Sequence, residues 1–144
     1  MIYLDNNATT QPSPGVCAAM QRACAELWAN PSSVHRAGQA VRREVELARQ
    51  NFADLIGARA REVLVLSGGT ESIDLAFRGT LDAQPAGRAL VTTRVEHASI
   101  RDIAVAWEKG ATRPVRWAPL GEHGLVDLAA LESLLDGAGL VSIQ

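Results

Sequence analysis

The fold is decided by one continuous stretch, Val63-Leu64-Val65-Leu66-Ser67-Gly68-Gly69-Thr70-Glu71-Ser72. It opens with an apolar run, residues 63–66, which predicts a strand covered on both faces, as in parallel sheets. The two glycines then predict a tight turn. Apolar residues at helical spacing follow, among them Ile73 and Phe77, and they predict a helix. The stretch is therefore a strand, a turn and a helix in direct succession.

The same alternation continues to the end of the sequence. Apolar runs predict further strands at residues 89–92, 114–117 and 140–143. Between them, helical periodicity predicts one helix that ends at Lys109-Gly110 and another that Asp127 caps. Strand–helix–strand units repeated about every 25 residues predict an α/β fold, with a mainly parallel sheet and flanking helices.

The sequence before this stretch predicts a loop and two helices. Residues 1–12 are polar and show no helical period. Ser13-Pro14 then supplies an N-cap and a proline at the first helical position, which predicts a helix up to Ala29. After a break at residues 30–33, a second apolar stripe predicts a helix from about His35 to Ile56.

Composition excludes several classes of protein. The 144 residues carry 14 basic and 16 acidic side chains, a formal net charge of −2. These charges are interspersed, and no basic stripe indicates a nucleic-acid partner. No apolar run is long enough to span a membrane, and no signal peptide is visible at the N-terminus. We therefore expect a cytoplasmic protein.

The two cysteines predict neither a disulfide nor a metal site. Cys17 and Cys24 lie seven residues apart in a helix-patterned segment, roughly 10 Å along the axis. That separation is too long for a disulfide. No histidine or Cys-x-x-Cys spacing supports metal binding or a redox couple. Both thiols fall on the apolar stripe, so we expect buried small hydrophobic side chains.

The turn at Ser67-Gly68-Gly69-Thr70 is the first candidate binding site. Glycines let the backbone approach a ligand closely, and the free N–H groups of a helix N-terminus attract an anion such as phosphate. The spacing matches neither a Walker A loop nor the Gly-x-Gly-x-x-Gly pattern. The alternative is a tight strand–helix turn that binds nothing.

His97 is the second candidate. It follows the strand at residues 89–92, so it lies at the same carboxyl edge of the sheet as the Gly-Gly-Thr turn, where ligands of open α/β folds bind. The alternative is a polar surface residue in a loop. His35, at the start of a helix, and His123, in a turn, have no such placement.

Four motifs give a resemblance to a known family. They are Leu4-Asp5-Asn6-Asn7-Ala8-Thr9-Thr10, Asn30-Pro31-Ser32-Ser33-Val34-His35, Ser67-Gly68-Gly69-Thr70-Glu71-Ser72 and Glu96-His97. In this order and spacing the sequence resembles the cysteine desulfurases, which are pyridoxal-phosphate (PLP) enzymes of the class V aminotransferases. The resemblance covers the whole chain. It implies part of the large domain of a PLP-dependent transferase of fold type I, like that of aspartate aminotransferase.

The resemblance also implies site residues. Gly69 and Thr70 resemble the residues that hold the PLP phosphate. His97 resembles the histidine that stacks on the pyridine ring and assists proton transfer. Asn7 and Ala8 lie in a segment that passes close to the substrate in the family. Residues 1–12 are then the segment that packs with the small domain and the substrate site, and residues 13–144 an incomplete N-terminal part of the large PLP-binding domain.

The implied reaction converts L-cysteine to L-alanine and leaves an enzyme-bound persulfide for iron–sulfur cluster or thio-cofactor synthesis. The implied partners are a sulfur-acceptor or scaffold protein and a second subunit in a homodimer. No metal ligands are implied. Selenocysteine lyase, another class V enzyme or a non-catalytic phosphate-binding module are the alternatives.

One feature of the family is missing from the chain. Its enzymes bind PLP through a lysine, and the sequence has a single lysine, Lys109, which is expected to cap the end of a helix. The resemblance places the family's lysine and its sulfur-accepting cysteine beyond Gln144. The 144 residues alone are therefore expected to be inactive.

Overall fold

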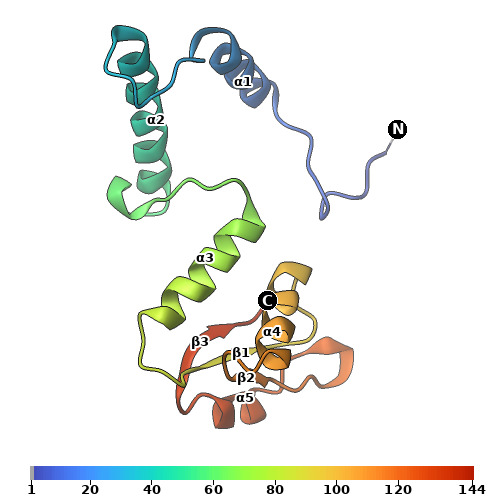
Figure 1. Ribbon diagram of the computed structural model, residues 1–144. Helices are drawn as coiled ribbons and strands as arrows, with labels where there is room; N and C mark the ends of the chain where they lie inside the picture. The colour runs from blue at the N-terminus through green and yellow to red at the C-terminus, as the bar shows by residue number, and fades with distance from the viewer. Residues whose placement is uncertain (1) are drawn as a thin grey trace. The chain divides into compact units, whose positions relative to one another are not determined.

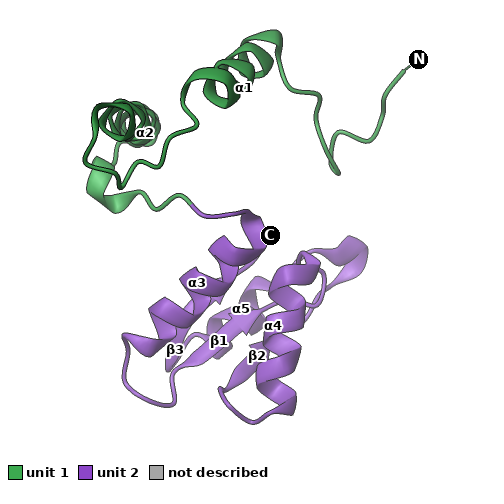
Figure 2. Ribbon diagram, turned by 45° about the horizontal axis from the view of Figure 1, so that its top comes forward, with its two compact units in different colours: residues 1–65 green, residues 66–144 purple. Residues whose placement is uncertain are grey.

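The computed structural model describes residues 2–144, which form two compact units (Figure 1). The first unit ends at Val65 and the second begins at Leu66 (Figure 2). Helices make up the regular structure of the first unit, whereas the second unit combines helices with a parallel sheet.

The first unit contains α1 (Pro14–Glu26), α2 (Arg36–Leu55) and a short 3₁₀-helix at Ala60–Glu62. Both long helices begin at capping side chains. Ser13 Oγ accepts a hydrogen bond from the N–H of Val16, and His35 Nδ1 accepts one from the N–H of Gly38. The cap expected at Ser13-Pro14 and the position of His35 at a helix start are confirmed.

Gly38 is needed where the turn at residues 30–33 passes over the start of α2. A Cβ atom on Gly38 would lie 2.6 Å from the carbonyl oxygen of Ser33 and 2.7 Å from that of Asn30. The turn is held by its own hydrogen bonds, because Asn30 Oδ1 accepts from the N–H of Ser32 at 2.8 Å. Only glycine, which has no Cβ atom, allows the backbone of the turn to lie this close to α2.

The expected burial of the two cysteines is wrong. Cys17 and Cys24 are exposed free thiols, and no residue of α1 is buried. The stripe that carries them is apolar, but nothing in the described part of the chain covers it. The helix that carries both cysteines was predicted correctly.

The strand expected at residues 63–66 is also wrong. Between the 3₁₀-helix and α3 the chain is irregular, and the Leu64 side chain is 73% exposed. A strand exists only when a neighbour supplies hydrogen-bond partners. Within residues 2–144, no strand of the sheet pairs with this apolar run.

The second unit alternates helices and strands. Its helices are α3 (Gly69–Asp82), α4 (Ala98–Lys109) and α5 (Leu128–Leu134), and its strands are β1 (Ala89–Thr92), β2 (Val115–Trp117) and β3 (Ala138–Ser142). The strand order is β2-β1-β3, and both pairings are parallel. The predicted α/β class with a parallel sheet is confirmed, with three strands in place of the four expected.

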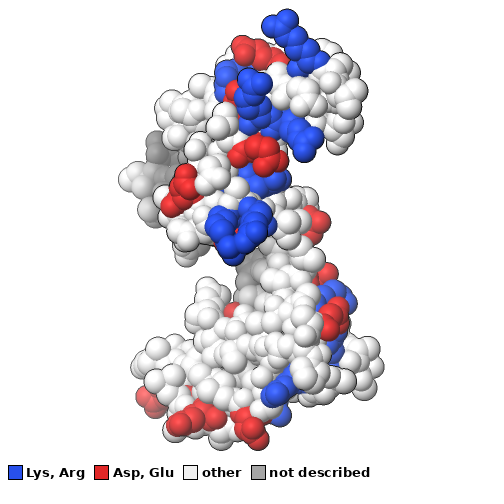
Figure 3. Space-filling model, turned by 90° about the vertical axis from the view of Figure 1, so that its left-hand side faces the viewer, with Lys and Arg blue, Asp and Glu red and all other residues white. Residues whose placement is uncertain are grey.

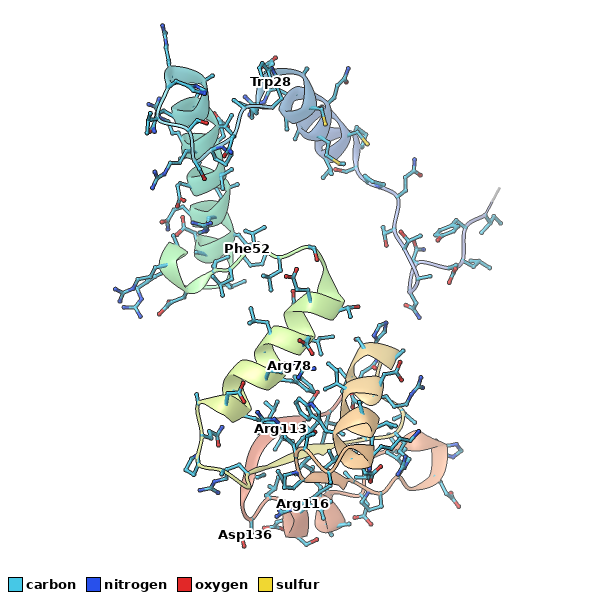
Figure 4. The ribbon with its side chains drawn as sticks, in the orientation of Figure 1. Trp28, Phe52, Arg78, Arg113, Arg116 and Asp136 are labelled. Atoms are coloured by element: carbon cyan, nitrogen blue, oxygen red, sulfur yellow. The ribbon has the colours of Figure 1, made fainter. Side chains whose placement is uncertain are left out.

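The core of this unit lies between the sheet and helices α3 and α4. It consists of five buried side chains: Phe77, Leu81, Leu90, Ala104 and Trp107. Every residue of β1 is buried, as expected for a central strand of a parallel sheet. On the opposite side, Arg116 of β2 donates hydrogen bonds to the carbonyl oxygens of Leu134 and Asp136, which ties the end of α5 to the sheet (Figure 4).

Basic and acidic side chains occur together on the face in Figure 3, which also has a broad area without charged side chains. Among the described residues, no helix is both long and apolar enough to cross a membrane. Within residues 2–144, no three His, Cys, Asp or Glu side chains are grouped so that they could hold a metal ion.

Candidate functional site

The turn before α3 leaves open space beside free backbone donors. Gly68 is the N-cap of the helix, and Ser72 is the residue whose N–H donates back to the Gly68 carbonyl. The N–H groups of Gly69, Thr70 and Glu71 precede this first helical bond, so they have no partner within the helix. A Cβ atom on Gly68 or Gly69 would meet nothing within 4 Å. The space over the turn therefore has room for an anion such as a phosphate group.

Glu71 fixes the geometry of this turn. Its Oε2 atom accepts hydrogen bonds from the Ser67 hydroxyl at 2.6 Å and from the Ser67 N–H at 2.7 Å. The hydroxyl, followed by the backbone N–H, holds the pKa of the Glu71 carboxyl below its usual range. Because this carboxylate is engaged with Ser67, the first N–H groups of α3 stay available.

We predict that acid loosens this turn. A carboxyl whose folded pKa is depressed stabilises the fold above its unfolded pKa of about 4.3, and this contribution is lost as the pH falls through the folded value. The protection of the Ser67 amide against hydrogen exchange, taken relative to the intrinsic exchange rate at each pH, should therefore fall below about pH 4. Glu71→Gln keeps an acceptor but cannot titrate, so the protection in this variant should show no such fall. An identical fall in both proteins would contradict the prediction.

His97 is the N-cap of α4, directly after the loop that follows β1. Its Nδ1 atom accepts a hydrogen bond from the N–H of Ser99 at 3.2 Å and lies 2.7 Å from the Ser99 hydroxyl oxygen. The side chain is exposed. With Nδ1 occupied by Ser99, the Nε2 atom is the nitrogen that is free to meet a ligand.

The second unit brings the turn and the histidine helix together. Helices α3 and α4 pack against the same core, and one groove is lined by Thr70 from the start of α3 and by Ser99 from the start of α4. Figures 1 and 2 both place the two helix starts at the same end of the sheet. The starts of α3 and α4 thus lie at one end of the sheet, although residues 63–66 form no strand that leads into the turn. The binding roles of Gly69, Thr70 and His97 stay predictions.

Glu96 is a residue whose role the sequence did not indicate. Its side chain is only 5% exposed, and its Oε1 atom accepts hydrogen bonds from the Thr93 hydroxyl at 3.0 Å and from the Gln144 N–H at 2.8 Å. The carboxylate thus joins the loop after β1 to the chain that follows β3. The sequence signal was only its place next to His97 in the Glu-His pair.

Asn7 and Ala8 belong to the first unit. They lie in an exposed turn at residues 6–8, in which the N–H of Ala8 donates to the carbonyl of Asp5 at 3.1 Å. Their expected position near a substrate stays a prediction.

Comparison with known proteins places these features in a family. The chain matches the aminotransferase class-V family over residues 2–144. It is 42% identical over 137 residues to cysteine desulfurase 2 of Trichormus variabilis, which covers 95% of this chain and 34% of that protein. It is 41% identical over 154 residues to the IscS-like cysteine desulfurase of Mycobacterium tuberculosis, which covers 100% of this chain and 38% of that protein.

Solved structures give the same result. The apo structure of a cysteine desulfurase from Thermococcus onnurineus matches with a TM-score of 0.82 and 32% identity, over 99% of this chain and 36% of that chain. A NifS-like protein matches with a TM-score of 0.86 and 29% identity, over 96% and 38% of the two chains. The chain therefore spans little more than a third of the length of its relatives. It belongs to the class V aminotransferase family, among relatives that are cysteine desulfurases.

Proposed function

We propose that the full-length protein is a PLP-dependent cysteine desulfurase, which converts L-cysteine to L-alanine and retains the sulfur as a persulfide. One observation carries the proposal. The open, donor-rich turn at Gly69 and Thr70 lies at the same end of the second unit as His97, in a chain whose relatives are cysteine desulfurases. The persulfide would serve iron–sulfur cluster or thio-cofactor synthesis.

Each residue of the site has a role in this proposal. The N–H groups of Gly69 and Thr70 and the Thr70 hydroxyl would bind the cofactor phosphate, helped by the positive end of the α3 dipole. PLP itself supplies an electron sink for bond cleavage at the amino acid. His97 would stack on its ring and carry a proton at Nε2, since Ser99 occupies Nδ1. Asn7 and Ala8 would lie near the substrate.

The wider assembly follows the family. Residues 1–12 would pack with the small domain and the substrate site, and residues 13–144 would form an incomplete N-terminal part of the large PLP-binding domain. The enzyme would be a homodimer that passes sulfur to an acceptor or scaffold protein. The location would be cytoplasmic.

The activity of the purified full-length protein tests the proposal. With PLP and a thiol reductant, it should release sulfide and alanine from L-cysteine in equal amounts. Preferred turnover of L-selenocysteine would instead indicate a selenocysteine lyase, and turnover of a different amino acid would indicate another class V enzyme. No turnover of any amino acid, with retained phosphate binding, would indicate a non-catalytic binding module.

We predict that residues 1–144 alone neither bind PLP covalently nor turn over L-cysteine. The single lysine, Lys109, is the last residue of α4, whereas His97 caps the first turn. The helix separates them by roughly 18 Å, at 1.5 Å per residue. Titration with PLP, borohydride reduction and peptide mapping should find no saturable labelling of Lys109. Stoichiometric labelling would contradict the prediction.

We predict that Thr70→Ala weakens anion binding at the turn about tenfold. A hydrogen bond to a charged group contributes about 1.5–3 kcal/mol, and the substitution removes the hydroxyl donor but keeps the backbone N–H groups. Titration of phosphate into both proteins, followed by amide shifts at Gly69, measures the change. Thr80→Ala, near the other end of α3, is the control and should bind phosphate as the parent does. Equal affinity of the Thr70→Ala variant would mean that the hydroxyl has no part in binding.

A further inference from the structure

The two partners of His97 Nδ1 both come from Ser99. The backbone N–H lies 3.2 Å from Nδ1 and the hydroxyl oxygen 2.7 Å from it. A backbone N–H only donates, so Nδ1 must be an acceptor in the neutral ring, and the proton of that ring sits on Nε2. Ser99 therefore determines which nitrogen of His97 carries the proton.

The two partners respond differently when the ring gains a second proton. An Nδ1 that carries hydrogen can no longer accept from the backbone N–H, and that contact becomes repulsive. A hydroxyl is both donor and acceptor, so the Ser99 side chain can rotate and accept from Nδ1. Of the two contacts, only the one to the hydroxyl persists in both protonation states of His97.

His35 is a second capping histidine, although its partner N–H lies three residues on rather than two. Its Nδ1 accepts from the N–H of Gly38 at 3.3 Å at the start of α2, and the residue two positions after it is Ala37. Protonation of His35 thus breaks its capping bond, and no hydroxyl of the described residues is hydrogen-bonded to its ring. His35 therefore serves as an internal control for His97.

We propose that Ser99 is a positioning residue, which keeps the His97 ring in one orientation while the ring gains and loses a proton. The effect on catalysis rests on the proposed function, in which His97 moves a proton at Nε2, whereas the effect on ring orientation does not. The charged groups at this end of the unit come from α3, from the loop before His97 and from α4: Glu71, Asp74, Arg78, Arg94, Glu96, Arg101 and Asp102. Each already has a partner. Glu71 is hydrogen-bonded to Ser67, and Glu96 to Thr93 and Gln144. Arg78 is paired with Asp74, and Arg101 with Asp102. Arg94 lies over the ring of Trp117.

The orientation is tested in the full-length enzyme with ¹⁵N-labelled histidine. Signals of His97 are assigned by their loss in His97→Gln, and its side-chain rotamer is followed by vicinal couplings as the ring is protonated. In the parent, His97 should keep one rotamer in both states, whereas His35 should become rotationally averaged. Ser99→Ala should make His97 behave as His35 does, and Ser99→Thr, which keeps the hydroxyl, should restore the parent result. A single His97 rotamer in both states of Ser99→Ala overturns the proposal.

The consequence for catalysis is tested with L-cysteine. Ser99→Ala should lower kcat about tenfold, a part of the roughly 10²- to 10⁴-fold that a positioned acid–base group supplies. KM and the affinity for PLP should stay unchanged, and Ser99→Thr should recover kcat. Ser133→Ala, which removes a hydroxyl from α5, is the control. An unchanged kcat in Ser99→Ala overturns the positioning role in catalysis. Full activity of His97→Gln would instead remove the proposed role of His97 and leave the rotamer result intact.

Discussion

Trp107→Ala should lower the free energy of unfolding of the second unit by about 3–5 kcal/mol, the range for deleting a large buried aromatic side chain. Trp107 is 5% exposed and lies in the core with Phe77 and Leu90. Its ring is tilted against that of Phe77, with centroids 6.4 Å apart. Trp107 is the largest of the five buried side chains of this core, so its removal leaves a large cavity between the sheet, α3 and α4.

Two arginines add to the cost of losing this ring. The guanidinium carbon of Arg78 lies 5.9 Å from the Trp107 ring centroid, and that of Arg113 lies 5.5 Å from it. Both arginines point toward the same region of the second unit in Figure 4, from α3 and from the loop before β2. Cation–π contacts at exposed sites contribute about 0.5–1 kcal/mol each. Trp107→Phe keeps an aromatic ring and should cost less than Trp107→Ala.

Urea denaturation followed by circular dichroism measures the effect. Trp28→Ala is the matched control, because Trp28 is 80% exposed in the first unit and its loss should change stability by less than about 0.5 kcal/mol. If both variants unfolded at the same urea concentration as the parent, the core would not depend on Trp107 and the packing described above would be wrong.

The sequence predicted the elements that local chemistry determines. Side-chain caps at Ser13 and Asp127 mark helix starts in both the pattern and the structure. Such caps depend on neighbours within a few residues, so a single sequence is enough to interpret them. The apolar run at residues 89–92 is a buried central strand because β2 and β3 supply its partners.

The failures concern partners that lie far away in the sequence. The run at residues 63–66 has the composition of a strand, but strand formation depends on a neighbour that is not found within residues 2–144. The stripe at Cys17 and Cys24 is amphipathic, but burial depends on a covering surface. Periodicity identifies the apolar face of a helix or strand, but it does not identify the element that packs against that face.

The residues of the candidate site also fall into two groups, those that the sequence indicates and those that it does not. Gly69, Thr70 and His97 follow from a turn and from the edge at which a parallel strand ends. The role of Glu96 does not, because it depends on the backbone N–H of Gln144, 48 positions further along the chain. The partner of Ser99 is local, because its N–H and hydroxyl lie against His97 Nδ1, two residues away. A hydroxyl two residues after a capping histidine is therefore a signal that sequence analysis can use.

Residues 1–144 alone should self-associate, because the first unit exposes an apolar groove. The groove is lined by Val45, Ala48, Arg49, Phe52, Val63, Leu64 and Val65. Phe52, at the C-terminal part of α2 (Figure 4), and Leu64 and Val65 are each more than half exposed. Fully burying one side chain of this size contributes about 1.5–3 kcal/mol, so covering several of them favours association of two copies.

The sheet of the second unit favours the same outcome. In the order β2-β1-β3, both β2 and β3 are edge strands among the described residues, and each presents unpaired backbone groups on its outer side. Exposed edges and contiguous apolar patches are features that soluble monomers normally avoid. We therefore expect a mass above the 15.3 kDa of one chain, rising with concentration, in light scattering at several concentrations.

Charge substitutions test whether association occurs through the groove or through nonspecific apolar contacts elsewhere. Phe52→Glu and Leu64→Lys should each shift the association to higher protein concentration by at least about tenfold, the equivalent of roughly 1.4 kcal/mol. Val34→Lys is the control: Val34 is 91% exposed in the same unit but does not line the groove, so its substitution should leave association unchanged. Mass spectrometry of the sample identifies any retained second polypeptide. A 15.3 kDa monomer at every concentration, with cooperative unfolding, would contradict the prediction, because the exposed groove would then be stable in water without a cover.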